Sequence, residues 1–154
     1  MLIAFIGVIL LLPACRNEQP PISSESEVPL FSKSYIDTHD GYSEAVVLRS
    51  EGLKTIYISG QVGTGEDLDS QMRSALLNLK EVLENTGATM EDVVKMNTYI
   101  VDYGPQSLTT FRNVRKELLG ETDMPASTLV GVEALALPEW LIEIEAVAVV
   151  RVTE

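Results

Sequence analysis

The last third of the chain carries the strongest constraint on what it can fold into. Residues 124–132 and 141–149 are two apolar runs rich in β-branched residues, which is typical of strands buried on at least one face. In the second run Glu143 and Glu145 lie two positions apart, so both project from the same face of the strand. Because a carboxylate on an apolar strand is costly to bury without water or a polar partner, we predict a polar site beside that face.

Composition excludes several classes of function. The chain has 154 residues, enough for one domain, and a net charge of −12. It contains no run of basic residues that could neutralise phosphates, so we expect no nucleic acid among its partners. With one cysteine, Cys15, and one histidine, neither an intrachain disulfide nor a Cys/His zinc site can form. We predict no metal, although a site made only of carboxylates remains open.

The N-terminus is typical of an exported protein. Residues 2–12 form an apolar run as long as the core of a signal peptide and too short to span a bilayer as a helix. The run ends in Leu-Pro-Ala-Cys, which resembles a bacterial lipoprotein signal, although no basic residue precedes it and the proline is unusual. We predict a signal peptide over residues 1–15 and a lipid on Cys15, which would hold the domain at a membrane surface in the cell envelope. The alternatives are a buried apolar segment with a chance cysteine, or a mis-called start codon and a cytoplasmic protein.

One folded domain is expected after a linker. Residues 16–33 are rich in Pro, Ser and Glu without apolar periodicity, which predicts a flexible linker, and the domain is expected over residues 34–154. The apolar periodicity predicts an α+β fold with the order β-β-β-α-β-α-β-β, a mixed sheet and both helices on one face. Asp67 is expected to cap the first helix and Ser107 the second. Besides the closing runs, the expected elements are strands over residues 45–50, 55–59 and 93–101 and helices over residues 67–87 and 107–119.

The second face of this sheet is expected to remain apolar and uncovered. We place on it Val47, Ile56 or Ile58, and Val147 or Val149. A large exposed apolar sheet face implies a partner, most simply further copies of the same chain. The pattern therefore predicts a homo-oligomer.

Several ordered motifs resemble the RidA/YjgF family over residues 34–152. They are Gly-Tyr-Ser-Glu-Ala-Val at 41–46, Ile-Ser-Gly-Gln at 58–61, Pro-Ala-Ser-Thr at 125–128 and Ile-Glu-Ile-Glu-Ala-Val-Ala at 142–148. The resemblance implies a chorismate-mutase-like fold and a homotrimer with small-molecule clefts at the subunit interfaces. It also implies hydrolysis of enamines and imines such as 2-aminoacrylate to 2-keto acids and ammonia, without a metal or an organic cofactor.

The resemblance assigns roles to particular residues. Glu143 matches the glutamate that positions the attacking water, a role that suits a carboxylate able to shuttle the proton of that water. The alternative for Glu143 is a carboxylate at a wet rim, and for Tyr42 it is an aromatic residue at the trimer seam. The positions that match substrate contacts are Tyr42, Ser59, Gly60, Gln61, Ser127 and Thr128.

One of these positions departs from the deaminases. They carry arginine where this chain has Ser127, and a guanidinium there binds the substrate carboxylate in a bidentate pair. Its loss should weaken carboxylate binding by about 1.5–3 kcal/mol. We therefore expect an ordinary 2-imino acid such as 2-aminoacrylate to be a poor ligand. Arg112, on the second predicted helix, is considered as a replacement cation, against the alternative that it faces solvent.

Three functions follow from this reasoning. The first is an enzyme that hydrolyses an enamine, imine or related carbonyl compound. The second is a non-catalytic trimer that binds a metabolite or acts as a scaffold at the cell envelope. The third, the endoribonuclease activity attached to some relatives, ranks last because the acidic surface repels RNA.

Overall fold

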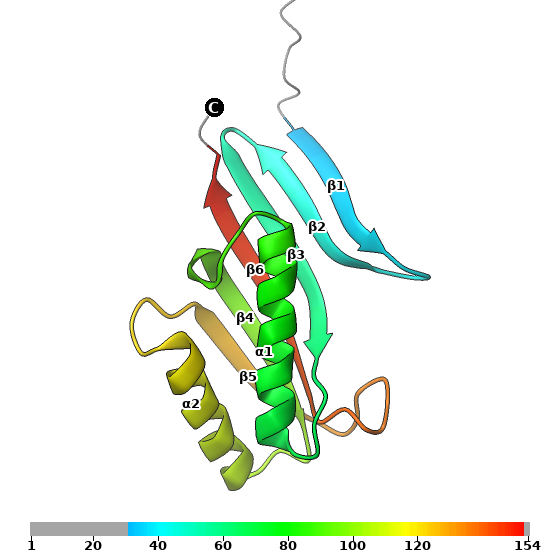
Figure 1. The fold of residues 1–154 in the computed structure, drawn as a ribbon, viewed down its shortest axis with the longest axis vertical. Helices are drawn as coiled ribbons and strands as arrows, with labels where there is room; N and C mark the ends of the chain where they lie inside the picture. The colour runs from blue at the N-terminus through cyan, green and yellow to red at the C-terminus, as the bar shows by residue number, and fades with distance from the viewer. Residues whose placement is uncertain (1–30, 153–154) are drawn as a thin grey trace, which may run out of the picture.

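The computed structural model describes residues 31–152 as one mixed sheet with two helices on one face (Figure 1). The strands lie in the order β1-β2-β3-β6-β4-β5, and every neighbouring pair is antiparallel except β4–β5. The predicted fold class and element order are confirmed. The elements are β1 (Phe31–Thr38), β2 (Ser43–Ser50), β3 (Leu53–Val62), α1 (Leu68–Asn85), the 3-10 turn η1 (Met90–Asp92), β4 (Val93–Val101), α2 (Pro105–Leu119), β5 (Ala126–Val132) and β6 (Ile142–Arg151).

The sheet begins earlier than the sequence indicated. β1 starts at Phe31, so residues 31–33 belong to the sheet and not to the predicted linker. Their exposure alternates along the strand, a period of two that an assignment by composition overlooks. The predicted signal peptide, the rest of the linker and Cys15 lie outside the described residues and stay predictions. Within residues 31–152 no helix has the length and apolar character needed to cross a membrane.

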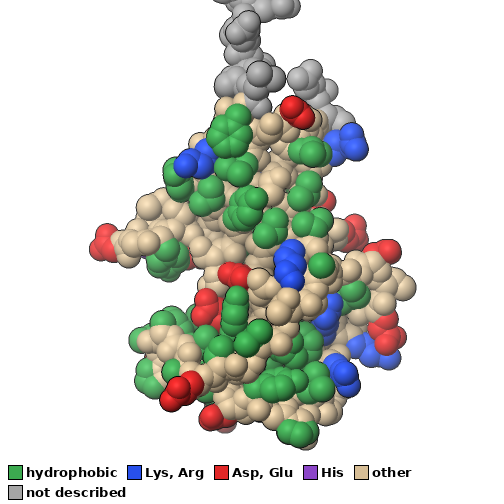
Figure 2. Space-filling model, turned by 180° about the vertical axis from the view of Figure 1, so that it is seen from behind, with side chains coloured by type: hydrophobic (Ala, Val, Ile, Leu, Met, Phe, Trp, Pro, Cys, Tyr) green, Lys and Arg blue, Asp and Glu red, His purple; other side chains and the backbone are tan. Residues whose placement is uncertain are grey.

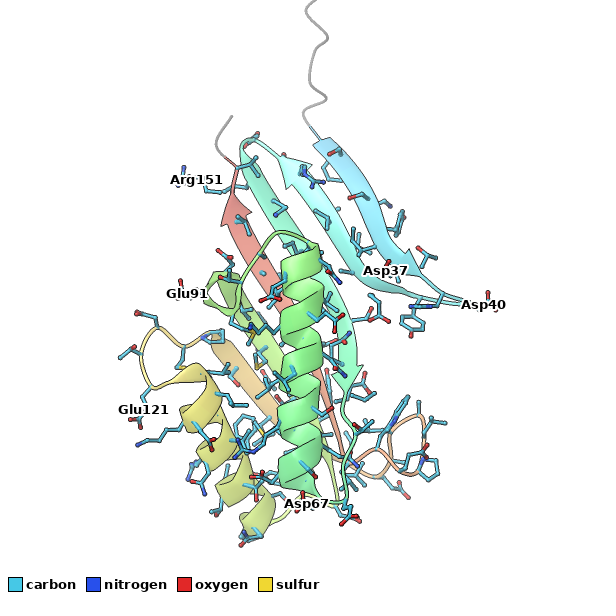
Figure 3. The ribbon with its side chains drawn as sticks, in the orientation of Figure 1. Asp37, Asp40, Asp67, Glu91, Glu121 and Arg151 are labelled. Atoms are coloured by element: carbon cyan, nitrogen blue, oxygen red, sulfur yellow. The ribbon has the colours of Figure 1, made fainter. Side chains whose placement is uncertain are left out.

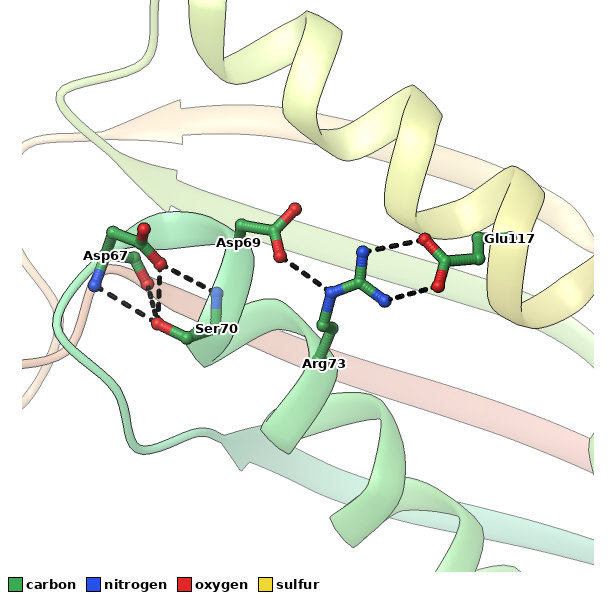
Figure 4. Close-up of polar contacts among 5 residues, drawn as sticks. All are labelled: Asp67, Asp69, Ser70, Arg73 and Glu117. Atoms are coloured by element: carbon green, nitrogen blue, oxygen red, sulfur yellow. Dashed lines mark hydrogen bonds and ion pairs between the residues drawn. The ribbon is translucent and has the colours of Figure 1, made fainter.

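The first helix is held at both ends. Asp67 caps α1 as predicted: its carboxylate accepts the backbone N–H of Ser70 at 2.9 Å, and the Ser70 hydroxyl accepts the N–H of Asp67 at 3.2 Å (Figure 4). At the other end the Lys54 ammonium, on the buried face of β3, donates to the carbonyls of Thr86 and Gly87 at 2.7 and 2.8 Å. A cation at this end complements the helix dipole.

The second helix starts before its predicted cap. Gly104 is the N-cap of α2 and Pro105 its first residue, which fits because proline lacks the N–H that a first helical turn leaves unpaired. Ser107, the predicted cap, lies inside the helix, where its hydroxyl accepts the Gly104 N–H at 3.2 Å. Arg73 ties α2 to α1, because its guanidinium donates to both carboxylate oxygens of Glu117 at 2.9 and 2.7 Å (Figure 4).

The core lies between the helices and one face of the sheet. Leu79 and Leu83 of α1 and Ile144 of β6 are all fully buried there. Val47, Ile56 and Ile58, which the sequence placed on the uncovered face, are 1%, 0% and 4% exposed and belong to this core. That prediction was wrong because period two says which residues share a face and not which face the helices cover.

The opposite sheet face, called the open face below, carries a continuous apolar row. Tyr35, Val46, Tyr57 and Val147 are cross-strand partners in successive strands from β1 to β6. Tyr35 and Tyr57 are 56% and 49% exposed. In Figure 2, which views the molecule from this side, apolar side chains gather over much of the surface. The prediction of an exposed apolar face therefore holds, and of the residues placed on it Val147 is confirmed.

Candidate functional site

The two carboxylates of β6 project from the open face and have different partners. Glu145 accepts hydrogen bonds from the amide of Asn97 at 2.6 Å and the hydroxyl of Tyr99 at 3.0 Å, both on β4. The bond to Glu145 is the main reason that the pKa of Tyr99 is raised. Among residues 31–152 no side chain or backbone group donates a hydrogen bond to the carboxylate of Glu143. The donors on β4 thus leave Glu143 as the carboxylate free to hold a water molecule or a ligand.

Two causes raise the pKa of the Glu143 carboxyl. The larger is partial burial, which disfavours the charged form, and the smaller is the negative charge of Glu145 on the same strand face. Both follow from the sequence pattern Ile-Glu-Ile-Glu, which places two carboxylates on one face of an otherwise apolar strand. A carboxyl with a raised pKa and free lone pairs can accept a proton and later return it.

Gly60 provides the space in which the Glu143 carboxylate lies. A Cβ atom on Gly60 would overlap Oε1 of Glu143 and would stand 2.5 Å from Cδ and 2.7 Å from Cγ. The ladder between β3 and β6 is irregular here, between Ile58 and Gln61, as expected of a β-bulge. Glycine at this position therefore allows the end of β3 to pass beside the carboxylate.

What we call the strand-end cluster consists of three further predicted residues, Tyr42, Ser59 and Gln61, together with Glu44. The Gln61 amide donates to Glu44 at 2.9 Å, and the Tyr42 hydroxyl reaches the other oxygen of Glu44 at 3.4 Å. Ser59 donates to the backbone carbonyl of Ser43 at 2.6 Å. Tyr42 is 54% exposed, so its ring is available to a partner or ligand. Sequence reasoning missed Glu44, whose position in the Gly-Tyr-Ser-Glu motif was the available signal.

Ser127 and Arg112 lie elsewhere, in a depression of about 640 Å³ between α2 and β5 that we call the edge pocket. Glu121, labelled in Figure 3, lies in the loop that borders the pocket. Ser127 is the cross-strand partner of buried Met96, so its side chain lies on the helix side of the sheet. Thr128 points to the open face, where its hydroxyl accepts a hydrogen bond from Lys95 at 2.6 Å. Ser127 and Thr128, which are adjacent in the sequence, thus lie on opposite faces of the sheet.

The arginine that reaches Ser127 is Arg115. Its Nη1 donates to the Ser127 hydroxyl at 3.2 Å, while Arg112 lines the same pocket and is exposed. Sequence reasoning considered Arg112 and missed Arg115, one helical turn further on. The signal was the spacing from Phe111 and Val114, because these buried residues mark the inward side of α2.

The predicted site residues therefore fall into two groups within one chain. Glu143, Gly60 and the strand-end cluster lie on β6, on β3 and at the start of β2, whereas Ser127, Thr128 and Arg112 belong to β5 and α2 at the far edge of the sheet. The sheet itself separates Ser127 from Glu143, because the two side chains lie on opposite faces. Within residues 31–152 no group of three His, Cys, Asp or Glu side chains is arranged to hold a metal ion.

Comparisons with known proteins agree with this architecture. A family model described as Endoribonuclease L-PSP matches residues 32–150. A 2-iminobutanoate/2-iminopropanoate deaminase from Dermatophagoides farinae is 34% identical over 118 residues, which cover 71% of this chain and 86% of that protein. The crystal structure of Rv2704 from Mycobacterium tuberculosis, a member of the YjgF/YER057c/UK114 family, matches with a TM-score of 0.66 and 31% identity, over 77% of this chain and all of that one.

A second solved structure is YyfB of Yersinia pestis, from the conserved Rid protein family. It is 39% identical, with a TM-score of 0.57, and the match covers 75% of this chain and 97% of that one. Sequence, strand order and these structural neighbours all lead to the same group of proteins. The chain belongs to the RidA/YjgF family, which the Endoribonuclease L-PSP model describes.

Proposed function

We propose that the protein hydrolyses a small enamine or imine, with Glu143 positioning and activating the attacking water. The observation that carries this proposal is the state of Glu143: half-buried, without a hydrogen-bond donor among the described residues, and with a raised pKa. Its neighbour Glu145 has its own donors in Asn97 and Tyr99, so the two carboxylates do not compete for them. A relative in Dermatophagoides farinae named as a 2-iminobutanoate/2-iminopropanoate deaminase supports the same reaction class.

The chemistry needs one carboxylate and one water. As the water oxygen bonds to the imine carbon, the C=N π electrons move to nitrogen and Glu143 takes a proton from the water. Glu143 then returns that proton to nitrogen, which gives the neutral carbinolamine. Glu143 next transfers the hydroxyl proton of the carbinolamine to the nitrogen, the C–N bond breaks, and ammonia leaves as the C–O bond becomes a carbonyl. The balance is imine plus water to carbonyl compound plus ammonia, with no redox change. A raised pKa suits both the uptake and the return of the proton.

We place the reaction in a cleft between copies of the chain, in a homotrimer. Two observations support this arrangement. The apolar row Tyr35, Val46, Tyr57 and Val147 on the open face is too large to remain in contact with water. The predicted site residues also fall on two separate parts of one chain, and a second copy could bring them together.

The alternative is a trimer that binds a metabolite or acts as a scaffold without turnover. One observation favours it: β5 carries Ser127 where the deaminases carry arginine, so this strand offers a carboxylate only a short neutral donor. The two functions differ in whether wild-type protein accelerates release of a keto acid from an imine.

The test compares Glu143→Gln with the wild type on 2-iminobutanoate and 2-iminopropanoate generated in situ by an amino-acid oxidase. We expect the rate of keto-acid release to fall by about 10²- to 10⁴-fold, the usual worth of a general base. Glu133→Gln, which changes an exposed glutamate after β5, should retain the wild-type rate. A fully active Glu143→Gln variant would overturn the mechanism. A wild type that accelerates neither imine would favour the non-catalytic alternative.

A further inference from the structure

Arg115 has the surroundings of an anion-binding residue rather than of a structural one. Its guanidinium lies beside the Phe111 ring, with Cζ 5.7 Å from the ring centroid, and this contact restricts its position. Its Nε is buried, and no acceptor among the described residues pairs with it. The one hydrogen bond recorded for its side chain goes to Ser127, a neutral hydroxyl.

Arg115 also has no counter-ion, although the chain is strongly acidic. Among residues 31–152, no carboxylate oxygen lies within 4.0 Å of it. The acidic residue that borders the pocket, Glu121, pairs with Lys116 at 3.0 Å. On the same helix pair Arg73 is fully occupied by Asp69 and Glu117. An arginine whose one hydrogen bond goes to a neutral hydroxyl keeps guanidinium donors for a ligand, and a planar guanidinium fits a carboxylate best.

We propose that Arg115 binds the carboxylate of the substrate, and that it supplies from α2 the guanidinium that the deaminases carry at position 127 of β5. The inference rests on the proposed function and names its substrate class, small 2-imino acids. Serine at position 127 suits this arrangement, because a short side chain leaves the Arg115 fork room and adds one hydroxyl donor. The proposal therefore departs from the expectation that Ser127 makes a 2-imino acid a poor ligand.

The edge pocket has space for such a ligand. Its volume of about 640 Å³ exceeds that of a four-carbon keto acid, and it opens to the surface at the edge of the sheet. Arg112 lines the same pocket and adds a second positive charge, while Leu129 and Phe111 supply apolar contact for a short alkyl chain. The pocket therefore combines a carboxylate donor with an apolar wall.

Binding is measured by calorimetry on the full-length protein, with 2-oxobutanoate as the probe and 2-oxobutanamide as its uncharged counterpart. Arg115→Gln should weaken 2-oxobutanoate binding about 10- to 100-fold and leave 2-oxobutanamide binding unchanged. Arg115→Lys keeps the positive charge but loses the planar guanidinium. Its affinity for 2-oxobutanoate should therefore lie between the affinities of the wild type and Arg115→Gln. Arg49→Gln is the matched control, because Arg49 also donates to a serine, Ser34 at 3.5 Å, on the opposite edge of the sheet.

A complementary variant tests the site without removing Arg115. Ser127→Asp places a carboxylate beside the guanidinium, so it should abolish 2-oxobutanoate binding and raise the melting temperature. Wild-type affinity in both Arg115→Gln and Ser127→Asp, or a wild type that binds the acid no better than the amide, overturns the inference. If the wild type binds the acid through Arg115 and yet releases no keto acid from an imine, the proposed function fails and the binding site stands.

Discussion

Replacing Gly60 with alanine tests the position of Glu143 without touching its chemistry. The new methyl group would overlap Oε1 and lie 2.5 Å from Cδ and 2.7 Å from Cγ of Glu143. Unstrained carbon–carbon contacts lie at about 3.5–4.0 Å, so the carboxylate must retreat by roughly 1 Å. A displacement of about 1 Å can cost roughly 10²-fold in rate, or about 2.7 kcal/mol of activation free energy.

Stability should change far less than activity. The clash involves the end of a flexible side chain, and an off-rotamer side chain costs only about 0.5–1.5 kcal/mol. Alanine in a strand recovers about 0.5–1 kcal/mol relative to glycine. We therefore expect urea denaturation to give an unfolding free energy close to that of the wild type, while kcat for 2-iminobutanoate hydrolysis falls about 100-fold.

Two controls separate displacement of Glu143 from other effects. Gly104→Ala also adds a methyl group, but a Cβ there meets nothing within 4 Å, so its rate should match that of the wild type. In a Glu143→Gln background, Gly60→Ala should add little further loss, because both changes act on the same group. A Gly60→Ala variant within threefold of the wild-type rate would refute the assignment of Glu143 as the water-positioning residue.

Three further predictions concern stability. Lys54→Met leaves the carbonyls of Thr86 and Gly87 without their buried donor. It should lower the unfolding free energy measured by urea denaturation by about 2–3 kcal/mol. Lys80→Met, at an exposed lysine, should change the unfolding free energy by no more than about 0.5 kcal/mol. Arg73→Ala should lower the melting temperature in low salt and much less in 1 M salt, because the α1–α2 ion pair is exposed; a salt-independent loss would contradict this. Glu143→Gln should be more stable than the wild type at neutral pH, and the difference should vanish in acid. A carboxyl whose folded pKa is raised favours folding below its unfolded pKa, and that contribution is lost as pH rises through the folded pKa. A stability difference between Glu143→Gln and the wild type that does not change with pH would contradict the raised pKa of Glu143.

The periodic features of this protein could be predicted from the sequence because they depend only on residues close together in the chain. A period of two placed Glu143 and Glu145 on one strand face, and spacings of three and four located both helices to within a few residues. Asp67 and Gly87 marked the ends of α1, since capping depends on residues only three or four positions apart. The order of the elements then restricted the topology to a mixed sheet with two crossover units and both helices on one face.

Only the tertiary structure decided which surfaces and side chains meet. Val47 and Ile56 could have faced either side of the sheet until the packing of α1 assigned them to the core. Arg112 and Arg115 are both arginines and lie one helical turn apart on α2. The packing of α2 against β5 brings Arg115, and not Arg112, within hydrogen-bond distance of Ser127. Such contacts depend on strand register, helix rotation and side-chain length acting together across residues far apart in the chain, and no local pattern encodes that combination.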